Sequence, residues 1–189
     1  MKYLLIGLFM ALTLGGCSTR SPSANFYLLE NEFSDAEKTG NLRVGLGPVS
    51  VADYLQKPQI AIRTNSSQII FSEFDRWASD LRGLIISSLQ HDLAIELNTN
   101  NVFEFPWRKS DQVEVSIQLD IKRLDASFDD SSAFLEAKVT LSRKDGPSVV
   151  RSFALREALE GDGYAAAVTA ERLLIKQLAK KIAQLIQQA

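Results

Sequence analysis

Two segments in the second half of the chain alternate apolar and polar residues, and this alternation constrains the fold most strongly. From Val113 to Ile121 every second residue is apolar, and Leu135–Leu141 repeats the pattern. A third strand is expected from Ser148 to about Glu157. A period of two is typical of strands with one buried and one solvated face. Short turns rich in Asp, Ser, Gly and Pro separate the segments, which predicts an antiparallel meander.

Strand signals also dominate the first third of the chain. Pro48 implies that the strand containing it is interrupted or lies at a sheet edge, and glycines 45 and 47 allow a neighbour to approach closely. The polar joint at residues 65–67 predicts a hairpin between the strands on either side of it. The expected strands are Phe26–Leu29, Leu42–Val51, Gln59–Thr64, Gln68–Ser72 and Val102–Phe105.

Two segments have a helical period instead. Apolar residues recur at spacings of three and four from Arg76 to about Asn98, with the acidic residues Glu73 and Asp75 near the expected start. A second apolar stripe, from Val168 to Ile186, follows the glycines at 161 and 163. Packing both stripes on one sheet buries them. We therefore predict a single α/β (α+β) domain, a mixed, mostly antiparallel sheet with two long helices packed on it.

The N-terminus has the features of a bacterial export signal. Lys2 supplies a positive charge, Tyr3–Leu14 is apolar, and small residues precede Cys17, the single cysteine of the chain. The apolar stretch is shorter than the roughly 20 residues that a membrane-spanning helix needs. The ending Leu14-Gly15-Gly16-Cys17 resembles the lipobox of bacterial lipoproteins, whose cysteine receives a diacylglycerol before the signal is cleaved. The alternative, a short buried helix ending in cysteine, explains fewer of these features.

The expected processing divides the chain into three parts. Residues 1–16 are the signal peptide, 17–25 the lipidated N-terminus and flexible linker, and 26–189 the folded domain. The diacylglycerol and an amide-linked acyl chain such as palmitate hold strongly, because each buried CH₂ contributes about 0.8 kcal/mol. Ser18 stands where an Asp favours inner-membrane retention in enterobacterial lipoproteins. That resemblance implies an outer-membrane anchor, with the domain facing the periplasm.

Charge and composition exclude several functions. With 21 Lys+Arg against 23 Asp+Glu, the net charge is -2, so the chain lacks the basic excess of a nucleic-acid-binding domain. A single cysteine excludes an internal disulfide and a metal site built on paired thiolates. His91 has no partner at metal-ligand spacing, and the glycines around Leu46 lack the Lys and Ser/Thr of a phosphate loop. We therefore expect a protein that is not an enzyme and has no catalytic residues, metal or cofactor.

Residues 42–107 carry the motifs of a known family. The motifs are Val44-Gly45-Leu46-Gly47-Pro48-Val49, Tyr54-Leu55, Lys57-Pro58-Gln59-Ile60, Arg63, Phe74-Asp75-Arg76-Trp77-Ala78, Leu81 and Phe105-Pro106-Trp107. In this order and spacing they resemble the ABC-type transport auxiliary lipoproteins typified by PqiC (YmbA). The resemblance implies an outer-membrane lipoprotein without catalytic residues. It also implies a lipid transport system that maintains membrane integrity, built from an inner-membrane permease-like protein and a periplasmic MCE-domain protein of the PqiB type.

Within these motifs we predict a partner-binding surface, because aromatic and Arg side chains often dominate interfaces. The candidate residues are Tyr54, Leu55, Pro58, Arg63, Arg76 and Trp77. Each also has an architectural interpretation. Trp77 fits the helical stripe, and Pro58 can serve only to fix its loop. Arg63 and Arg76 have acidic candidates for ion pairs inside the domain in Asp53 and Glu73.

Two other functional hypotheses stay open at the level of sequence. A lipoprotein that carries a lipid or another small ligand in an apolar cavity would act on its own, whereas an adaptor docks a partner. A homo-oligomeric ring of several copies around a bridging tube is geometrically compatible with the adaptor role. The sequence leaves the transported lipid, the direction of transport and the number of copies undetermined.

Overall fold

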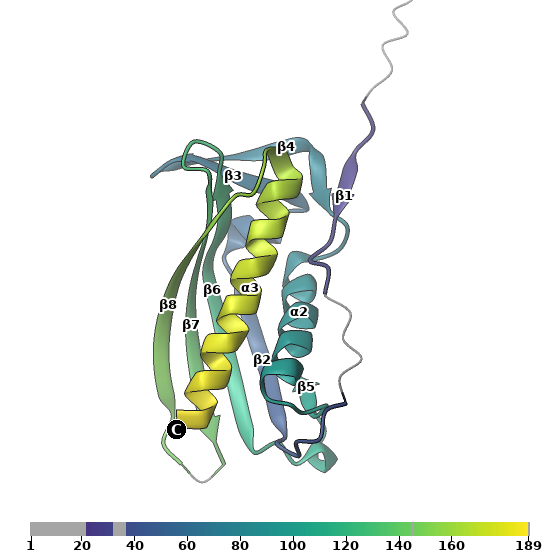
Figure 1. Ribbon diagram of the computed structural model, residues 1–189, viewed down its shortest axis with the longest axis vertical. Coiled ribbons are helices and arrows are strands. Elements are labelled where there is room, and N and C mark those ends of the chain that lie inside the picture. The colour runs from purple at the N-terminus through teal and green to yellow at the C-terminus, as the bar shows by residue number, and fades with distance from the viewer. Residues whose placement is uncertain (1–21, 32–36, 145, 189) are drawn as a thin grey trace, which may run out of the picture.

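The computed structural model describes residues 22–31, 37–144 and 146–188 (Figure 1). The predicted signal peptide and Cys17, the predicted lipid attachment site, therefore lie outside the described residues. The strands are β1 (Asn25–Tyr27), β2 (Val44–Val51), β3 (Gln59–Asn65), β4 (Gln68–Trp77), β5 (Val102–Glu104), β6 (Val115–Ser127), β7 (Ser132–Arg143) and β8 (Val149–Ala158). The helices are α2 (Leu81–Glu96) and α3 (Gly163–Gln188), with the short 3-10 helices η2 (Asp53–Gln56) and η3 (Lys109–Asp111).

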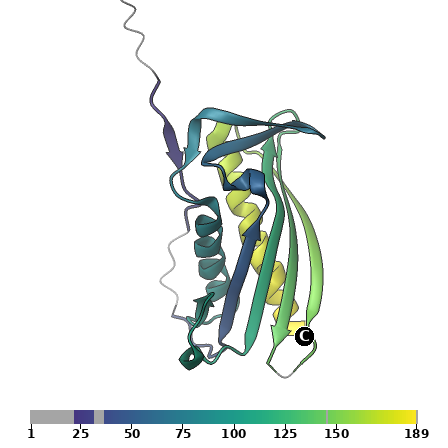
Figure 2. The ribbon, with the colours of Figure 1, turned by 180° about the vertical axis from the view of Figure 1, so that it is seen from behind.

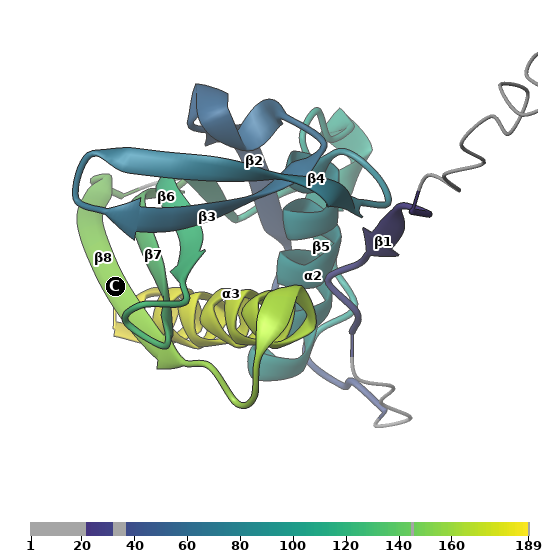
Figure 3. The same ribbon diagram turned by 90° about the horizontal axis from the view of Figure 1, so that it is seen from above.

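The strands form one mixed sheet, which confirms the predicted fold class. The central strand of the sheet is β6, which pairs antiparallel with β7 on one side. On the other side β6 pairs parallel with β2 and, near the C-terminal end of β6, with β3. β6, β7 and β8 form the expected meander, and β3 and β4 form the expected hairpin. This hairpin runs across one end of the long strands (Figures 2 and 3). The pairing of β2 shifts between Leu46 and Val49, the interruption that Pro48 predicts.

Both helices lie on the same face of the sheet, so the core is a single layer between helices and strands (Figure 1). The stripe of α3 is buried as predicted, and five alanines let the helix approach the strands closely. These alanines are Ala166, Ala167, Ala170, Ala179 and Ala183. An ion pair joins the helices, because Arg172 of α3 donates to both oxygens of Asp92 of α2 at 2.7 and 2.8 Å.

The start of the first long helix differs from the prediction. Strand β4 continues through Trp77, and α2 begins only at Leu81. Asp80 supplies the cap, since its side chain accepts a hydrogen bond from the Gly83 amide at 3.1 Å. The apolar spacing misled the prediction because Trp77 and Leu81 both face the core, although the backbone changes from strand to helix between them.

The acidic residues expected at the helix start lie in strand β4 instead. Asp75 accepts hydrogen bonds from Asn25 at 2.9 Å, Tyr27 at 2.9 Å and Ser72 at 2.8 Å. Burial acts to raise the pKa of Asp75, but these three hydrogen bonds outweigh it and the pKa is lowered. The carboxylate therefore fixes β1 to β4, and this stabilisation is lost when the pH falls through the lowered pKa.

Candidate functional site

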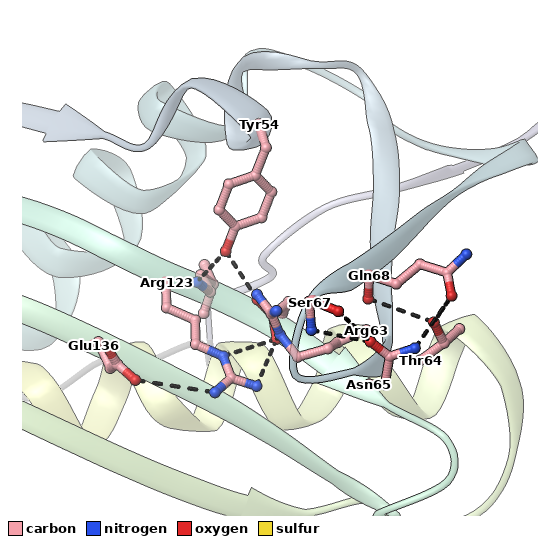
Figure 4. Close-up of polar contacts among 10 residues, drawn as sticks. Tyr54, Arg63, Thr64, Asn65, Ser67, Gln68, Arg123 and Glu136 are labelled. Atoms are coloured by element: carbon pink, nitrogen blue, oxygen red, sulfur yellow. Dashed lines mark hydrogen bonds and ion pairs between the residues drawn. The ribbon is translucent and has the colours of Figure 1, made fainter.

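Two of the predicted partner-binding residues converge on one buried carboxylate. Asp125 of β6 is fully buried, and Arg63 of β3 donates to its two oxygens from Nε at 3.0 Å and from Nη2 at 2.8 Å. Tyr54 of η2 donates its hydroxyl at 2.9 Å, and Arg123 donates from Nε at 2.9 Å. Figure 4 shows Tyr54, Arg63 and Arg123 pointing toward the same place from three elements. We name Asp125, Tyr54, Arg63 and Arg123 the Asp125 cluster.

The protonation states of Arg63 and Tyr54 allow both side chains to donate hydrogen bonds to Asp125, which suits a structural role for the Asp125 cluster. Hydrogen bonding to Asp125 raises the pKa of Arg63, so its guanidinium stays charged. Burial, followed by the nearby carboxylate, raises the pKa of Tyr54, so its hydroxyl stays neutral and donates. Both carboxylate oxygens accept hydrogen bonds from these side chains. The cluster joins η2 and the β3–β4 hairpin to the centre of the sheet.

The other members of the predicted partner surface are divided between core and surface. Leu55 and Trp77 are buried, at 3% and 5% exposure. Pro58 is exposed, and its carbonyl accepts a hydrogen bond from the Trp77 amide at 2.8 Å. Arg76 is half-buried and donates to the Glu73 carbonyl at 3.4 Å. The structure thus leaves Pro58 and part of Arg76 at the surface, and contact with a partner remains a prediction for the whole set.

Sequence reasoning missed Asp125 and Arg123. The architectural alternative for Arg63 was an ion pair with Asp53 or Glu73, but Arg63 pairs with a carboxylate 62 residues away. The sequence signal that could have indicated these residues is the point after Ile121 where the alternation of apolar and polar residues ends. The pairing of β6 shifts between Ile121 and Arg123, and the four residues that follow, 124–127, are all buried. A charged residue in such a stretch needs a partner, because an unpaired buried charge is costly.

Four further motif residues, two glycines and two aromatic residues, meet at the opposite end of the sheet. A Cβ atom on Gly45 of β2 would lie 2.7 Å from the Trp107 ring, and one on Gly47 would lie 2.8 Å from Phe105. The two rings pack edge to face with centroids 5.4 Å apart. Gly47 also has a φ of +119°, which favours glycine. The predicted role of these glycines, close approach of a neighbour, is confirmed, and the neighbours are the aromatic pair of the Phe105-Pro106-Trp107 motif.

Replacing Gly45 with alanine should therefore disturb Trp107. We expect the free energy of unfolding to fall by about 1–3 kcal/mol, because the added methyl group overpacks the contact. Urea unfolding followed by tryptophan fluorescence measures this change. The matched control is Gly83→Ala in α2, where the nearest atom is 3.8 Å from the added Cβ and a gain of about 0.5–1 kcal/mol is expected. Equal stability of Gly45→Ala and the unsubstituted protein would contradict the packing described above.

The described residues contain no grouping suited to metal binding. Within residues 22–31, 37–144 and 146–188, no three His, Cys, Asp or Glu side chains gather to hold an ion. His91 is half-buried on α2, and its Nε2 has no hydrogen-bond partner there. In the same ranges, no helix is long and apolar enough to cross a membrane.

Comparison with known proteins identifies the family. The sequence profile described as "ABC-type transport auxiliary lipoprotein component" matches residues 27–183. The chain belongs to this family. The match confirms the resemblance drawn from residues 42–107, and it makes the chain an auxiliary lipoprotein of a transport system. No curated protein matches the sequence significantly.

Two crystal structures share the fold of this auxiliary lipoprotein. One is an uncharacterized protein, with a TM-score of 0.72, 19% identity, and coverage of 87% of this chain and 99% of that chain. The other is protein XCC0632 from Xanthomonas campestris, with a TM-score of 0.70, 14% identity, and coverage of 88% and 100%. At these identities the likeness concerns the fold alone.

Proposed function

We propose that the chain is a non-enzymatic docking component of a trans-envelope lipid transport system. It is anchored in the outer membrane through Cys17, faces the periplasm, and binds a periplasmic MCE-domain protein of the PqiB type. The family match supports a role as an auxiliary transport lipoprotein. The motifs of residues 42–107 and Ser18 after the cysteine support the finer assignment.

The observation that carries the proposal is the position of β1. This strand follows the predicted anchor and linker, and it is fixed to β4 at one end of an elongated domain (Figure 1). Phe26 of β1 and Leu28, which directly follows the strand, are 66% and 56% exposed. A domain held at this end presents its opposite end away from the anchoring membrane. That geometry suits a part that meets a partner crossing the periplasm.

The internal packing also favours docking over ligand carriage. A lipid carrier needs an apolar cavity, and the natural place for one is between the helices and the sheet. There the inward side chains Ile117, Leu119, Leu135 and Val139 are fully buried, and the alanines of α3 bring the helix close to them. A ring of several copies is compatible with docking, since among the described residues β8 pairs with β7 alone and its other edge has no strand beside it. Light scattering of the purified protein distinguishes a ring from a monomer.

Recovery of the partner from membranes tests the proposed function. Gentle detergent extraction of the tagged protein is expected to recover an MCE-domain protein, and Cys17→Ala should lose this partner and weaken the envelope barrier. Ser18→Asp is the matched control, because it keeps the acylated cysteine but should move the anchor to the inner membrane. If the protein is extracted alone and Cys17→Ala leaves the barrier intact, the proposal is wrong.

A further inference from the structure

A basic hollow lies at the end of the domain opposite β1. Its volume is about 690 Å³, within the range of ligand-binding pockets. Four of its eight lining side chains are cationic and one is acidic, in a chain whose net charge is -2. The lining residues are Arg43, Trp107, Arg108, Lys109, Gln112, Val113, Glu114 and Lys144.

The two carboxylates near the hollow accept hydrogen bonds from backbone amides. Glu114 accepts a hydrogen bond from the Arg43 amide at 3.1 Å, and Asp111 accepts one from the Arg108 amide at 2.7 Å. Among the residues that the structure describes, none of the four cations of the hollow forms an ion pair. Because the four cations outnumber these two carboxylates, the hollow has a net positive charge that attracts anionic groups.

The walls of the hollow are held in place without a ligand. The Nε of Arg43 donates to the Asp111 carbonyl, and its guanidinium lies 5.3 Å from the centre of the Phe103 ring. Trp107 is fixed against Gly45, as described above. Gln112 adopts a left-handed conformation with φ of 45°, a conformation that costs a non-glycine residue about 1 kcal/mol or more. A site arranged in advance loses less entropy on binding.

The chemistry of the hollow fits a carboxylate-bearing peptide. Arginine and lysine pair with carboxylates, and Trp107 with Val113 supplies an apolar wall beside them. The headgroups of the anchoring membrane are a less suitable ligand, because α3 runs between the two ends of the domain (Figure 1). Its 26 residues correspond to about 39 Å at 1.5 Å per residue. We infer that the hollow receives an acidic segment of a partner protein, with carboxylates on Arg108, Lys109 and Lys144 and an apolar side chain against Trp107.

Peptide binding to the mature, acylated protein in non-ionic detergent tests this inference. The probe is a fluorescein-labelled peptide of about eight residues that alternates glutamate and leucine. Lys109→Glu combined with Lys144→Glu is expected to weaken binding at least tenfold, about 1.4 kcal/mol. The matched control, Lys122→Glu with Lys138→Glu, makes the same change of charge on the outer face of the sheet and should leave affinity within twofold. Raised salt should weaken binding.

Several results would overturn the inference. They are equal binding of a glutamine-for-glutamate peptide, equal loss in the control variant, or, at constant ionic strength, displacement of the peptide by inorganic phosphate or by detergent micelles that contain phosphatidylglycerol but not by micelles that contain phosphatidylcholine. The inference rests on the proposed function only for the existence of a partner. If the Lys109→Glu, Lys144→Glu protein still recovers its MCE-domain partner, the assignment of the hollow fails and the docking function stands. If the unsubstituted protein binds the peptide but recovers no MCE-domain partner, the proposed docking function fails and the assignment of the hollow as a site for acidic peptides stands.

Discussion

Replacing Asp125 with alanine is expected to lower the free energy of unfolding by about 3 kcal/mol. Asp125 is fully buried and accepts from Arg63, Arg123 and Tyr54. Its loss leaves two guanidinium groups without a counter-charge, and removing one partner of a buried pair typically costs about 3–5 kcal/mol. We expect the lower end of this range because the side chains of Arg63 and Arg123 remain 19% and 22% exposed to solvent. Urea unfolding followed by tryptophan fluorescence measures the change.

Asp120→Ala provides the matched control on the same strand. The Asp120 side chain is 33% exposed and pairs with Lys122, whose side chain is 62% exposed. Exposed pairs contribute about 0–1 kcal/mol, so the control should change stability by no more than that. Similar shifts in the two variants would show that the Asp125 cluster does not hold the hairpin to the sheet.

Replacing Glu171 with glutamine is expected to stabilise the protein at neutral and basic pH. Glu171 lies in α3 at 1% exposure, and one of its carboxyl oxygens has no hydrogen-bond partner among the described residues. Burial, with a further contribution from Asp125, raises the pKa of Glu171 well above the ordinary value of 4.5. The stability linked to its protonated form is therefore present below about pH 4.5 and is lost as pH rises through the raised pKa.

The expected gain of Glu171→Gln near pH 8 is about 1–3 kcal/mol, because each unit by which folding raises a carboxyl pKa costs about 1.4 kcal/mol of stability at high pH, and glutamine does not ionise. The gain should shrink toward zero near pH 4.5, because the protonated acid and the amide are both neutral and similar in shape. Unfolding free energies measured across this pH range test both statements. The control is Glu160→Gln at an exposed position, which should leave the pH profile unchanged. Parallel profiles for Glu171→Gln and the unsubstituted protein would refute the account.

Much of the fold follows from local sequence patterns. The alternation of Val113–Ile121 and Leu135–Leu141 predicted the meander, and the polar joint at 65–67 predicted the hairpin, because each feature depends on neighbouring residues. The start of α2 at Leu81 was missed because the apolar spacing continues from β4 into the helix, whereas the cap formed by Asp80 sets where the helix begins. The parallel pairing of β2 with β6 joins distant segments and has no local signal.

The candidate site was predictable only in part. The motifs of residues 42–107 identified the family, yet sequence order does not reveal that some of their residues gather in two separate clusters. One is the Asp125 cluster, and the other is the aromatic pair on Gly45 and Gly47. The second cluster forms a wall of the basic hollow through Trp107. The motifs thus shape the two ends of the domain, and the cations that line the hollow could be found only from the fold.

Photo-crosslinking in intact cells tests the central claim most directly, that the end of the domain distant from β1 docks the partner. A photoreactive residue would replace Lys109 at the hollow or, for comparison, Ala154 on the outer face of β8, both exposed. The account predicts a crosslink from position 109 to a periplasmic MCE-domain protein and none from position 154. Crosslinks to that protein from position 154 alone would contradict the account.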